Sequence, residues 1–143
     1  MPWPVEQKYI DDAQIALGVR FPRNFVARLR ESNGGEVTID RQTWWFHPVW
    51  DKSDKKRLSP TSNDIVRETK YARTLPGFPP SGVVIAHGLG PERLILLPLE
   101  DDPNQLGEAA YDWDPQHHEA TECIATTIMD LWVNADDESE EEP

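Results

Sequence analysis

Residues 17–35 constrain the fold of this chain more than any other stretch, because they hold two helix stops and one helix start. Gly18 follows a run with helical apolar periodicity, and a glycine there can take the left-handed conformation that ends a helix. Pro22 has the fixed φ that suits the first position of a new helix. Asn33-Gly34-Gly35 then ends that helix, since Asn and Gly tolerate a positive φ, and a strand pattern begins directly afterwards. The stretch predicts a pair of short helices that leads into a sheet.

The apolar patterns of the whole chain predict helices at both ends and strands between them. Helices are expected over Val5–Leu17, over Pro22–Ser32, from Ser62 or Asn63 as the cap to about Arg73, and over Ile124–Ala135. Strands are expected over Glu36–Asp40, Thr43–His47, Gly82–His87, Arg93–Leu97, Ala109–Trp113 and His118–Cys123. The polar segment Trp50–Pro60 is expected to be an exposed loop. This order predicts an α+β fold: a single domain with a mostly antiparallel twisted sheet, an N-terminal helix pair, one inserted helix and a C-terminal helix.

Charge divides the chain into a body and a tail. At 143 residues we expect one α+β domain over residues 1–135 and an acidic disordered tail over residues 136–143. The tail holds six acids, so half of the formal net charge of −12 lies there and −6 remains on the body. This surplus argues against binding to nucleic acid, which requires basic patches, and it permits steered association with a cationic protein. The tail itself is either a solvated terminus or an arm that engages a basic partner.

Cysteine content and hydropathy predict where such a chain resides. Cys123 is the single cysteine, and its apolar neighbours Ile124 and Ala125 predict a buried, inert thiol outside any internal disulfide. The N-terminus lacks a basic stretch followed by an apolar run, so no signal peptide is expected. No apolar stretch approaches the ~18 residues that span a membrane. We therefore expect a cytoplasmic protein that binds no membrane.

The order of these signals resembles the opening signature of the SUKH superfamily, which includes the yeast cell-wall-synthesis regulator of the Smi/Knr type and many bacterial immunity proteins. Leu17-Gly18, the Phe21-Pro22 helix entry and Asn33-Gly34-Gly35, followed by Glu36-Val37-Thr38-Ile39, carry the resemblance. It covers about Val5 to Val133, with Gly88–Leu97 as a second anchor. The family has a Gly-Asp pair near that second anchor, where this chain has Pro91-Glu92.

Three motifs are reminiscent of catalytic, phosphate-binding or metal sites, and each fits a structural interpretation better. His117-His118-Glu119 is predicted on a strand, where adjacent side chains point to opposite faces and cannot chelate one ion. Gly88-Leu89-Gly90 lacks the third glycine and the following helix of a dinucleotide site, so a hairpin turn is expected. Glu100-Asp101-Asp102 lacks the spacing of a calcium-binding hand, so it is expected to be an exposed loop or a contact loop for a basic partner. We therefore expect no catalytic residue, metal or cofactor.

The tryptophans are expected to divide between core and surface. Trp132 lies on the apolar face of the last predicted helix and is expected in the core. Trp44 and Trp45 point to opposite sides of one predicted strand, so at most one of them lies inside the covered face. Trp50 stands among charged residues and is either exposed, as a binding surface would require, or partly shielded by the charged loop.

These features favour a binding protein over an enzyme. The resemblance implies an immunity protein that binds a cognate polymorphic toxin, such as a nuclease, and neutralises it by stoichiometric occlusion. The residues expected to face this basic partner are Asp101, Asp102, Asp112 and Asp114, with Trp44 or Trp50 as an apolar anchor.

Two other functions compete with this one. The yeast relatives favour a regulatory protein-binding scaffold of the Smi/Knr type, for which the acidic tail would matter. A small hydrolase or metal enzyme would use His87, His117 or His118, but no nucleophile, base and orienting group stand at a fitting spacing for it.

Overall fold

The helix pair forms where the turn residues place it. Helix α1 (Gln7–Leu17) ends at Gly18, whose φ is 73° and whose N–H donates to the carbonyl oxygens of Gln14 and Ile15. Helix α2 (Arg23–Glu31) begins directly after Pro22. Pro22 is therefore the cap residue and not, as expected, the first residue of the helix. The Gln14 side-chain oxygen accepts the Phe21 N–H at 2.7 Å and ties the start of the second helix to the end of the first.

A computed structural model describes residues 3–39, 41–58, 61–116 and 119–133. These residues form a six-stranded antiparallel sheet in which each strand pairs with the next one in the sequence: β1 (Gly35–Ile39), β2 (Gln42–Phe46), β3 (Val83–His87), β4 (Arg93–Pro98), β5 (Leu106–Asp114) and β6 (Glu119–Ala125). The remaining helices are α3 (Lys55–Leu58), α4 (Ile65–Ala72) and α5 (Asp130–Val133). The expected α+β fold with an antiparallel sheet is confirmed.

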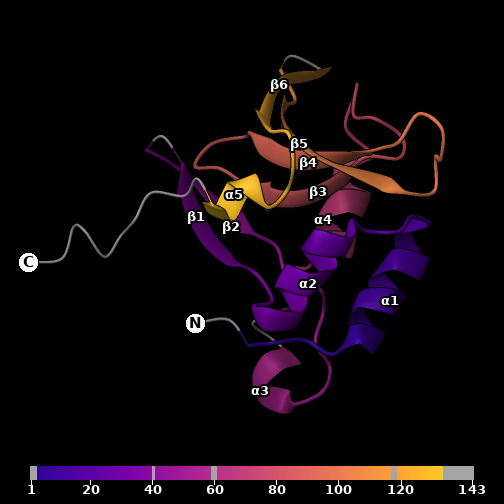
Figure 1. The fold of residues 1–143 in the computed structure, drawn as a ribbon, viewed down its shortest axis with the longest axis vertical. Coiled ribbons are helices and arrows are strands. Elements are labelled where there is room, and N and C mark those ends of the chain that lie inside the picture. Colours follow the sequence, from indigo (N-terminus) through magenta and orange to yellow (C-terminus); the bar gives the residue numbers. More distant parts are fainter. Residues whose placement is uncertain (1–2, 40, 59–60, 117–118, 134–143) are drawn as a thin grey trace, which may run out of the picture.

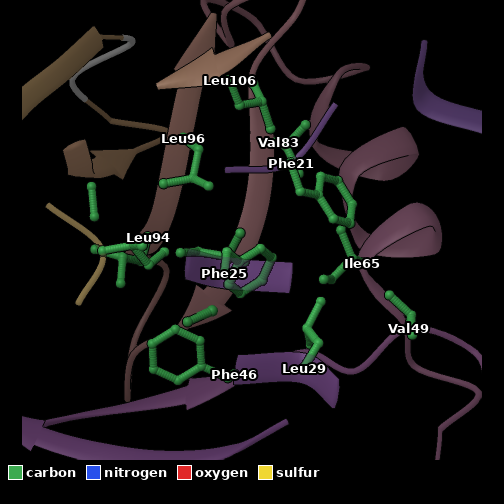
Figure 2. Close-up of a cluster of buried hydrophobic side chains, with 14 of the residues drawn as sticks. Phe21, Phe25, Leu29, Phe46, Val49, Ile65, Val83, Leu94, Leu96 and Leu106 are labelled. Carbon is green, nitrogen blue, oxygen red and sulfur yellow. The ribbon is translucent and has the colours of Figure 1, made fainter. Parts of the chain in front are cut away.

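Residues of α1, α2, α4 and α5 enclose the main core against the curled sheet. Figure 1 shows α1, α2 and α4 next to one another below the sheet in this view, with α5 close to β1 and β2. Phe25 and Leu29 of α2 meet Leu94 and Leu96 of β4 in this core, and Figure 2 shows their side chains converging with those of Phe46 and Ile65. Burying such side chains stabilises a fold by roughly 1.5–3 kcal/mol each.

A second, smaller cluster lies on the other face of β3, β4 and β5. Val84, Ile95 and Trp113 pack there against Phe78 and Ala72. The Phe78 and Trp113 rings meet edge to face with their centroids 4.9 Å apart. Because β3 and β4 are covered on both faces, their sequences read as continuous apolar runs instead of alternating ones.

Three local predictions are wrong. The cap of α4 is Asp64, whose side chain accepts the Arg67 N–H, in place of Ser62 or Asn63. The expected C-terminal helix starts late, because Ala125 at the end of β6 pairs with Ala110 of β5 before the chain turns into α5. Cys123 is exposed, on the edge strand β6, where its thiol donates to the Ala125 carbonyl oxygen at 3.3 Å.

Two further predictions fall on residues that the structure does not describe. The acidic tail, residues 136–143, and the pair His117 and His118 lie outside them. Among the described helices, none combines the length and the apolar character needed to cross a membrane.

Gly18 gives a direct test of the turn. An alanine there finds open space, since nothing lies within 4 Å of the position of its Cβ, but it is forced into the left-handed conformation. We expect Gly18→Ala to lower the free energy of unfolding by about 1 kcal/mol. Gly18→Asn should lose less, because Asn tolerates that conformation better. Urea unfolding of both variants measures the difference, and equal losses would contradict this account of the turn.

Candidate functional site

A groove with a volume of about 570 Å³ lies between α1, α4 and the segment that follows β2. We call it the Trp50 groove and define it by the residues that line it: Asp12, Ala13 and Ala16 of α1, Trp50 and Lys52, and Ser62, Asp64, Val66, Arg67 and Lys70 in and before α4. Its volume falls within the range of protein sites that bind small ligands.

Trp50 stands at this groove in a fixed position. Its indole Nε1–H donates to the Leu58 carbonyl oxygen at 3.1 Å, and its side chain remains 42% exposed. The ammonium group of Lys52 lies 5.1 Å from the centre of the ring. A large aromatic group that is already oriented loses little conformational freedom on binding, so it suits the role of an interface anchor.

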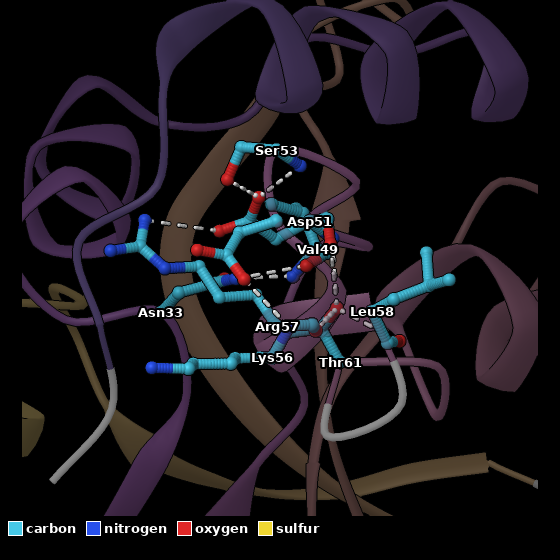
Figure 3. Close-up of polar contacts among 9 residues, drawn as sticks. Asn33, Val49, Asp51, Ser53, Lys56, Arg57, Leu58 and Thr61 are labelled. Atoms are coloured by element: carbon cyan, nitrogen blue, oxygen red, sulfur yellow. Dashed lines mark hydrogen bonds and ion pairs between the residues drawn. The ribbon is translucent and has the colours of Figure 1, made fainter.

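Hydrogen bonds on both sides of Trp50 hold its backbone. The buried Asn33 side chain donates to the Val49 carbonyl oxygen at 2.9 Å and accepts the Val49 N–H at 2.8 Å (Figure 3). The Thr61 hydroxyl accepts the Asp51 N–H at 2.8 Å and donates to the Arg57 carbonyl oxygen at 2.6 Å. Residue 50 is thus the one exposed position between two anchored neighbours.

The polar segment after Trp50 is organised by a buried carboxylate, which the expectation of an exposed loop missed. Asp51 is only 1% exposed, and its Oδ1 accepts hydrogen bonds from the Ser53 N–H and hydroxyl (Figure 3). Its Oδ2 lies 3.7 Å from the Arg57 guanidinium, which belongs to α3. Buried charges require such partners, so Asp51 fixes the path of the chain beyond the groove.

The two tryptophans of β2 take opposite faces of the sheet, as expected. Trp44 is 1% exposed and belongs to the main core, so it is not available as a surface anchor in this fold. Trp45 is half-buried on the other face, where it stacks on His87 with ring centres 5.7 Å apart. Of the two anchors that the sequence offered, Trp50 is the one on the surface.

The four candidate aspartates separate into two pairs. Asp101 and Asp102 follow β4, and the Asp102 carboxylate pairs at 2.8 Å with Arg20, which comes just after α1. Asp112 and Asp114 lie toward the other end of β5, and a strand extends over about 27 Å between Leu106 and Asp114. The first pair therefore adjoins α1, one wall of the Trp50 groove, and the second pair does not.

Several residues of this surface escaped the sequence reasoning. Ile15 is 79% exposed on α1, while Ile10, Ala13 and Leu17 of the same helix are buried. Ile15 does not share the helical spacing of the buried residues of α1, and this spacing could have predicted that it is exposed. Arg67 and Lys70 lie three residues apart on α4, so their pairing could be read from the predicted helix, but nothing in the sequence placed Lys52 beside them.

The turn that forms the second anchor of the family resemblance is closed by Glu92. Its Oε1 accepts the Gly90 N–H at 3.0 Å, and its carbonyl oxygen accepts the Gly88 N–H at 3.0 Å. The space that a Cβ at Gly88 would need is filled by the same carboxylate. Strand β4 follows directly, so this segment is a hairpin turn as expected.

Comparison with known proteins identifies the family of this chain. The model of the SMI1 / KNR4 family (SUKH-1) matches residues 4–131. The chain belongs to the SMI1/KNR4 family. The match spans both anchors of the resemblance, which is therefore confirmed. A search of curated proteins finds no match.

This SMI1/KNR4 domain has a second, smaller pocket of about 260 Å³, next to the Glu92 turn. His47 and His87 line it with their rings stacked 5.0 Å apart, together with Glu68, Glu92 and Arg93. The described residues contain no group of three or more His, Cys, Asp or Glu side chains placed to hold a metal ion.

Burial sets the protonation of His47. Its side chain is only 3% exposed, and its Nε2 has no hydrogen-bond partner among the described residues. Burial, and then the charges of His87 and Arg93, lower the pKa of His47 from 6.5 to about 4, while a backbone hydrogen bond with Asn63 acts in the opposite direction. The folded protein therefore keeps this imidazole neutral at pH 7.

His47 should make the stability depend on pH. The unfolded chain protonates this residue near pH 6.5 and the folded chain near pH 4, so its contribution is fully present above pH 6.5 and is lost as the pH falls toward 4. Between pH 7 and 4.5 we expect the free energy of unfolding of the unaltered protein to fall by about 2–3 kcal/mol more than that of His47→Gln. Urea unfolding at the two pH values measures this. Equal falls would show that His47 does not titrate differently in the two states.

Asn33 should be required for the position of Trp50. Asn33→Ala leaves the buried N–H and carbonyl oxygen of Val49 unpaired, so we expect the free energy of unfolding to fall by about 2–4 kcal/mol. Amide hydrogen exchange at Val49 should also accelerate, which locates the effect. Asn104→Ala, at an exposed amide outside this network, is the control. A small loss with unchanged exchange would contradict the anchoring role.

Proposed function

We propose that this SMI1/KNR4 protein is an immunity protein, which binds a cognate polymorphic toxin such as a nuclease and neutralises it by stoichiometric occlusion. The observation that carries the proposal is the Trp50 groove: an exposed, hydrogen-bonded tryptophan beside an open apolar cavity. The SMI1/KNR4 family is not known for enzymatic activity, which agrees with a role in binding.

Charge and anchor have separate parts in this mechanism. The net charge of −12 would draw a basic toxin toward the protein and accelerate the encounter. Trp50 would then be covered by the toxin, and an interface that extends over α1 would also take in Ile15 and, beyond it, the Arg20–Asp102 pair. Blocking the toxin requires only that the complex covers its active site, so no bond is made or broken.

The distance between the aspartate pairs limits how they take part. A standard interface buries about 800 Å² on each partner, which corresponds to a patch about 30 Å across. If both pairs contact the toxin, they lie at opposite margins of such a patch. Charges at an interface margin mainly affect the association rate, so we expect Asp112 and Asp114 to contribute to encounter more than to the lifetime of the complex.

A regulatory scaffold of the Smi/Knr type is the alternative, since family membership fits it equally well. The two functions differ in their demand on the acidic tail. A scaffold with weak partners would use residues 136–143, so deleting them should impair binding. A compact interface centred on Trp50 would keep its affinity after the same deletion.

Trp50 is the residue whose change tests the proposal. With the toxin encoded beside this protein, the unaltered chain should protect cells on co-expression and elute with the toxin in gel filtration. Trp50→Ala should weaken the complex by about 2 kcal/mol or more, roughly thirtyfold, and reduce protection.

Leu89→Ala is the matched control, because Leu89 is a highly exposed apolar side chain at a turn outside the groove. Full toxicity with the unaltered chain and no complex would count against an immunity function. Full protection by Trp50→Ala would count against this site.

A further inference from the structure

The Trp50 groove differs in charge from the chain that contains it. Lys52, Arg67 and Lys70 line it, all three are exposed, and none forms an ion pair with any described residue. Of the two carboxylates, Asp64 is buried and accepts the Arg67 N–H as the cap of α4. Asp12 is thus the single exposed acid among the lining residues. A protein with a net charge of −12 therefore presents a cationic rim at this groove.

The walls inside this rim are apolar and short. Ala13 and Ala16 line the groove from α1, Val66 lines it from α4, and Trp50 lines it from the segment after β2. Each helical wall extends over about one turn, which is roughly 5–6 Å. The groove is therefore long enough for one or two side chains of an incoming segment and the backbone beside them, with Arg67 and Lys70 one turn apart along its edge.

We propose that this groove binds a short acidic segment of the partner protein that carries a large apolar side chain. The apolar side chain packs between the two alanines of α1, Val66 and the Trp50 ring. Carboxylates on either side of it pair with Arg67 and Lys70, which have no other ion-pair partner among the described residues. This inference rests on the proposed function, since it names the part of the toxin that Trp50 receives.

An acidic segment is compatible with a basic toxin. The net charge of the chain acts while the two proteins approach, whereas ion pairs act only once the surfaces touch. At physiological salt, exposed charges more than about 8 Å apart are largely screened from one another, so the charge of the groove and that of the whole chain act at different stages. The tail of this same chain is acidic too, but residues 134–143 contain no large apolar residue. The acidic tail could therefore pair with the cationic rim, but it has no large apolar side chain to fill the groove.

Labelled peptides test the proposal on the full chain. The main probe carries three acidic residues on each side of a central Leu-Trp-Leu. One matched probe replaces the acids with lysines, and another replaces the centre with alanines. Fluorescence anisotropy should show that the main probe binds at least about tenfold more tightly than either matched probe.

Charge-reversed variants locate the binding. Arg67→Glu with Lys70→Glu, and Trp50→Ala separately, should each weaken the main probe about tenfold or more. Arg23→Glu with Arg30→Glu makes the same charge change on α2, at exposed positions outside the groove, and should leave the affinity within about twofold after allowance for the general charge effect.

Each contrary outcome has a separate meaning. If the main probe does not bind, or if the acidic and basic probes bind equally, the proposal that the groove binds an acidic segment is overturned. If Trp50→Ala loses protection against the toxin while Arg67→Glu with Lys70→Glu keeps it, the proposed function stands and this inference fails. If neutralising the six acids of the tail raises the probe affinity more than tenfold, the tail occupies the groove and the assignment to a partner is overturned.

Discussion

The buried amide of Asn33 determines the position of the proposed site. Its two hydrogen bonds to Val49 join the end of α2 to the chain that leaves β2, segments that are adjacent in space but separated by a hairpin in sequence. Both groups of the amide and both backbone groups of Val49 are satisfied by the same pair of bonds, so a shift of either segment would leave buried polar atoms unpaired. The two hydrogen bonds therefore fix the position of the segment around Trp50 relative to the helix pair.

The exposure of Trp50 follows from that position. Val49 is fully buried and Asp51 is held inward by its own hydrogen bonds, so the Trp50 side chain between these two fixed neighbours is the one left exposed. The motif that ends α2 thus has a second consequence beyond stopping a helix. Gly34 and Gly35 supply the positive φ values of the turn, while Asn33 supplies the amide that holds Val49 and so presents the aromatic side chain of Trp50, seventeen residues later.

The sequence predicted the parts of this fold that local physical chemistry determines. Apolar periodicity and turn residues gave α1, α2 and the β3–β4 hairpin, because each of these needs only neighbouring residues to satisfy its backbone. Tertiary contacts decided what was missed. Ala125 extends β6 because it pairs with Ala110 of β5. Asp51 is buried because the chain folds back on it: Arg57, inside the segment expected to be a loop, pairs with its carboxylate, and Thr61, just beyond that segment, accepts its backbone N–H.

The candidate site shows the same division. Strand geometry predicted that one of Trp44 and Trp45 would be buried. Which of the two is buried depended on the side of the sheet that the helix pair covers. The groove joins α1, α4 and the segment after β2, so its cationic rim could not be derived from the net charge of the chain.

The open groove is difficult to explain by stability alone. Ala16 is exposed among the residues that line the groove, and a larger apolar residue there would fill part of the space without disturbing the buried stripe of α1. Filling such a space commonly stabilises a protein by about 0.5–2 kcal/mol. Likewise, Lys52, Arg67 and Lys70 form no ion pair with a described residue, and like charges gathered at one place repel one another and would lose little by dispersal over an acidic surface. The exposed face of the ring and the unfilled wall stabilise this chain little on their own, and Arg67 and Lys70 have no ion-pair partner among the described residues; all of these gain contacts when an acidic, apolar segment of another protein fills the space.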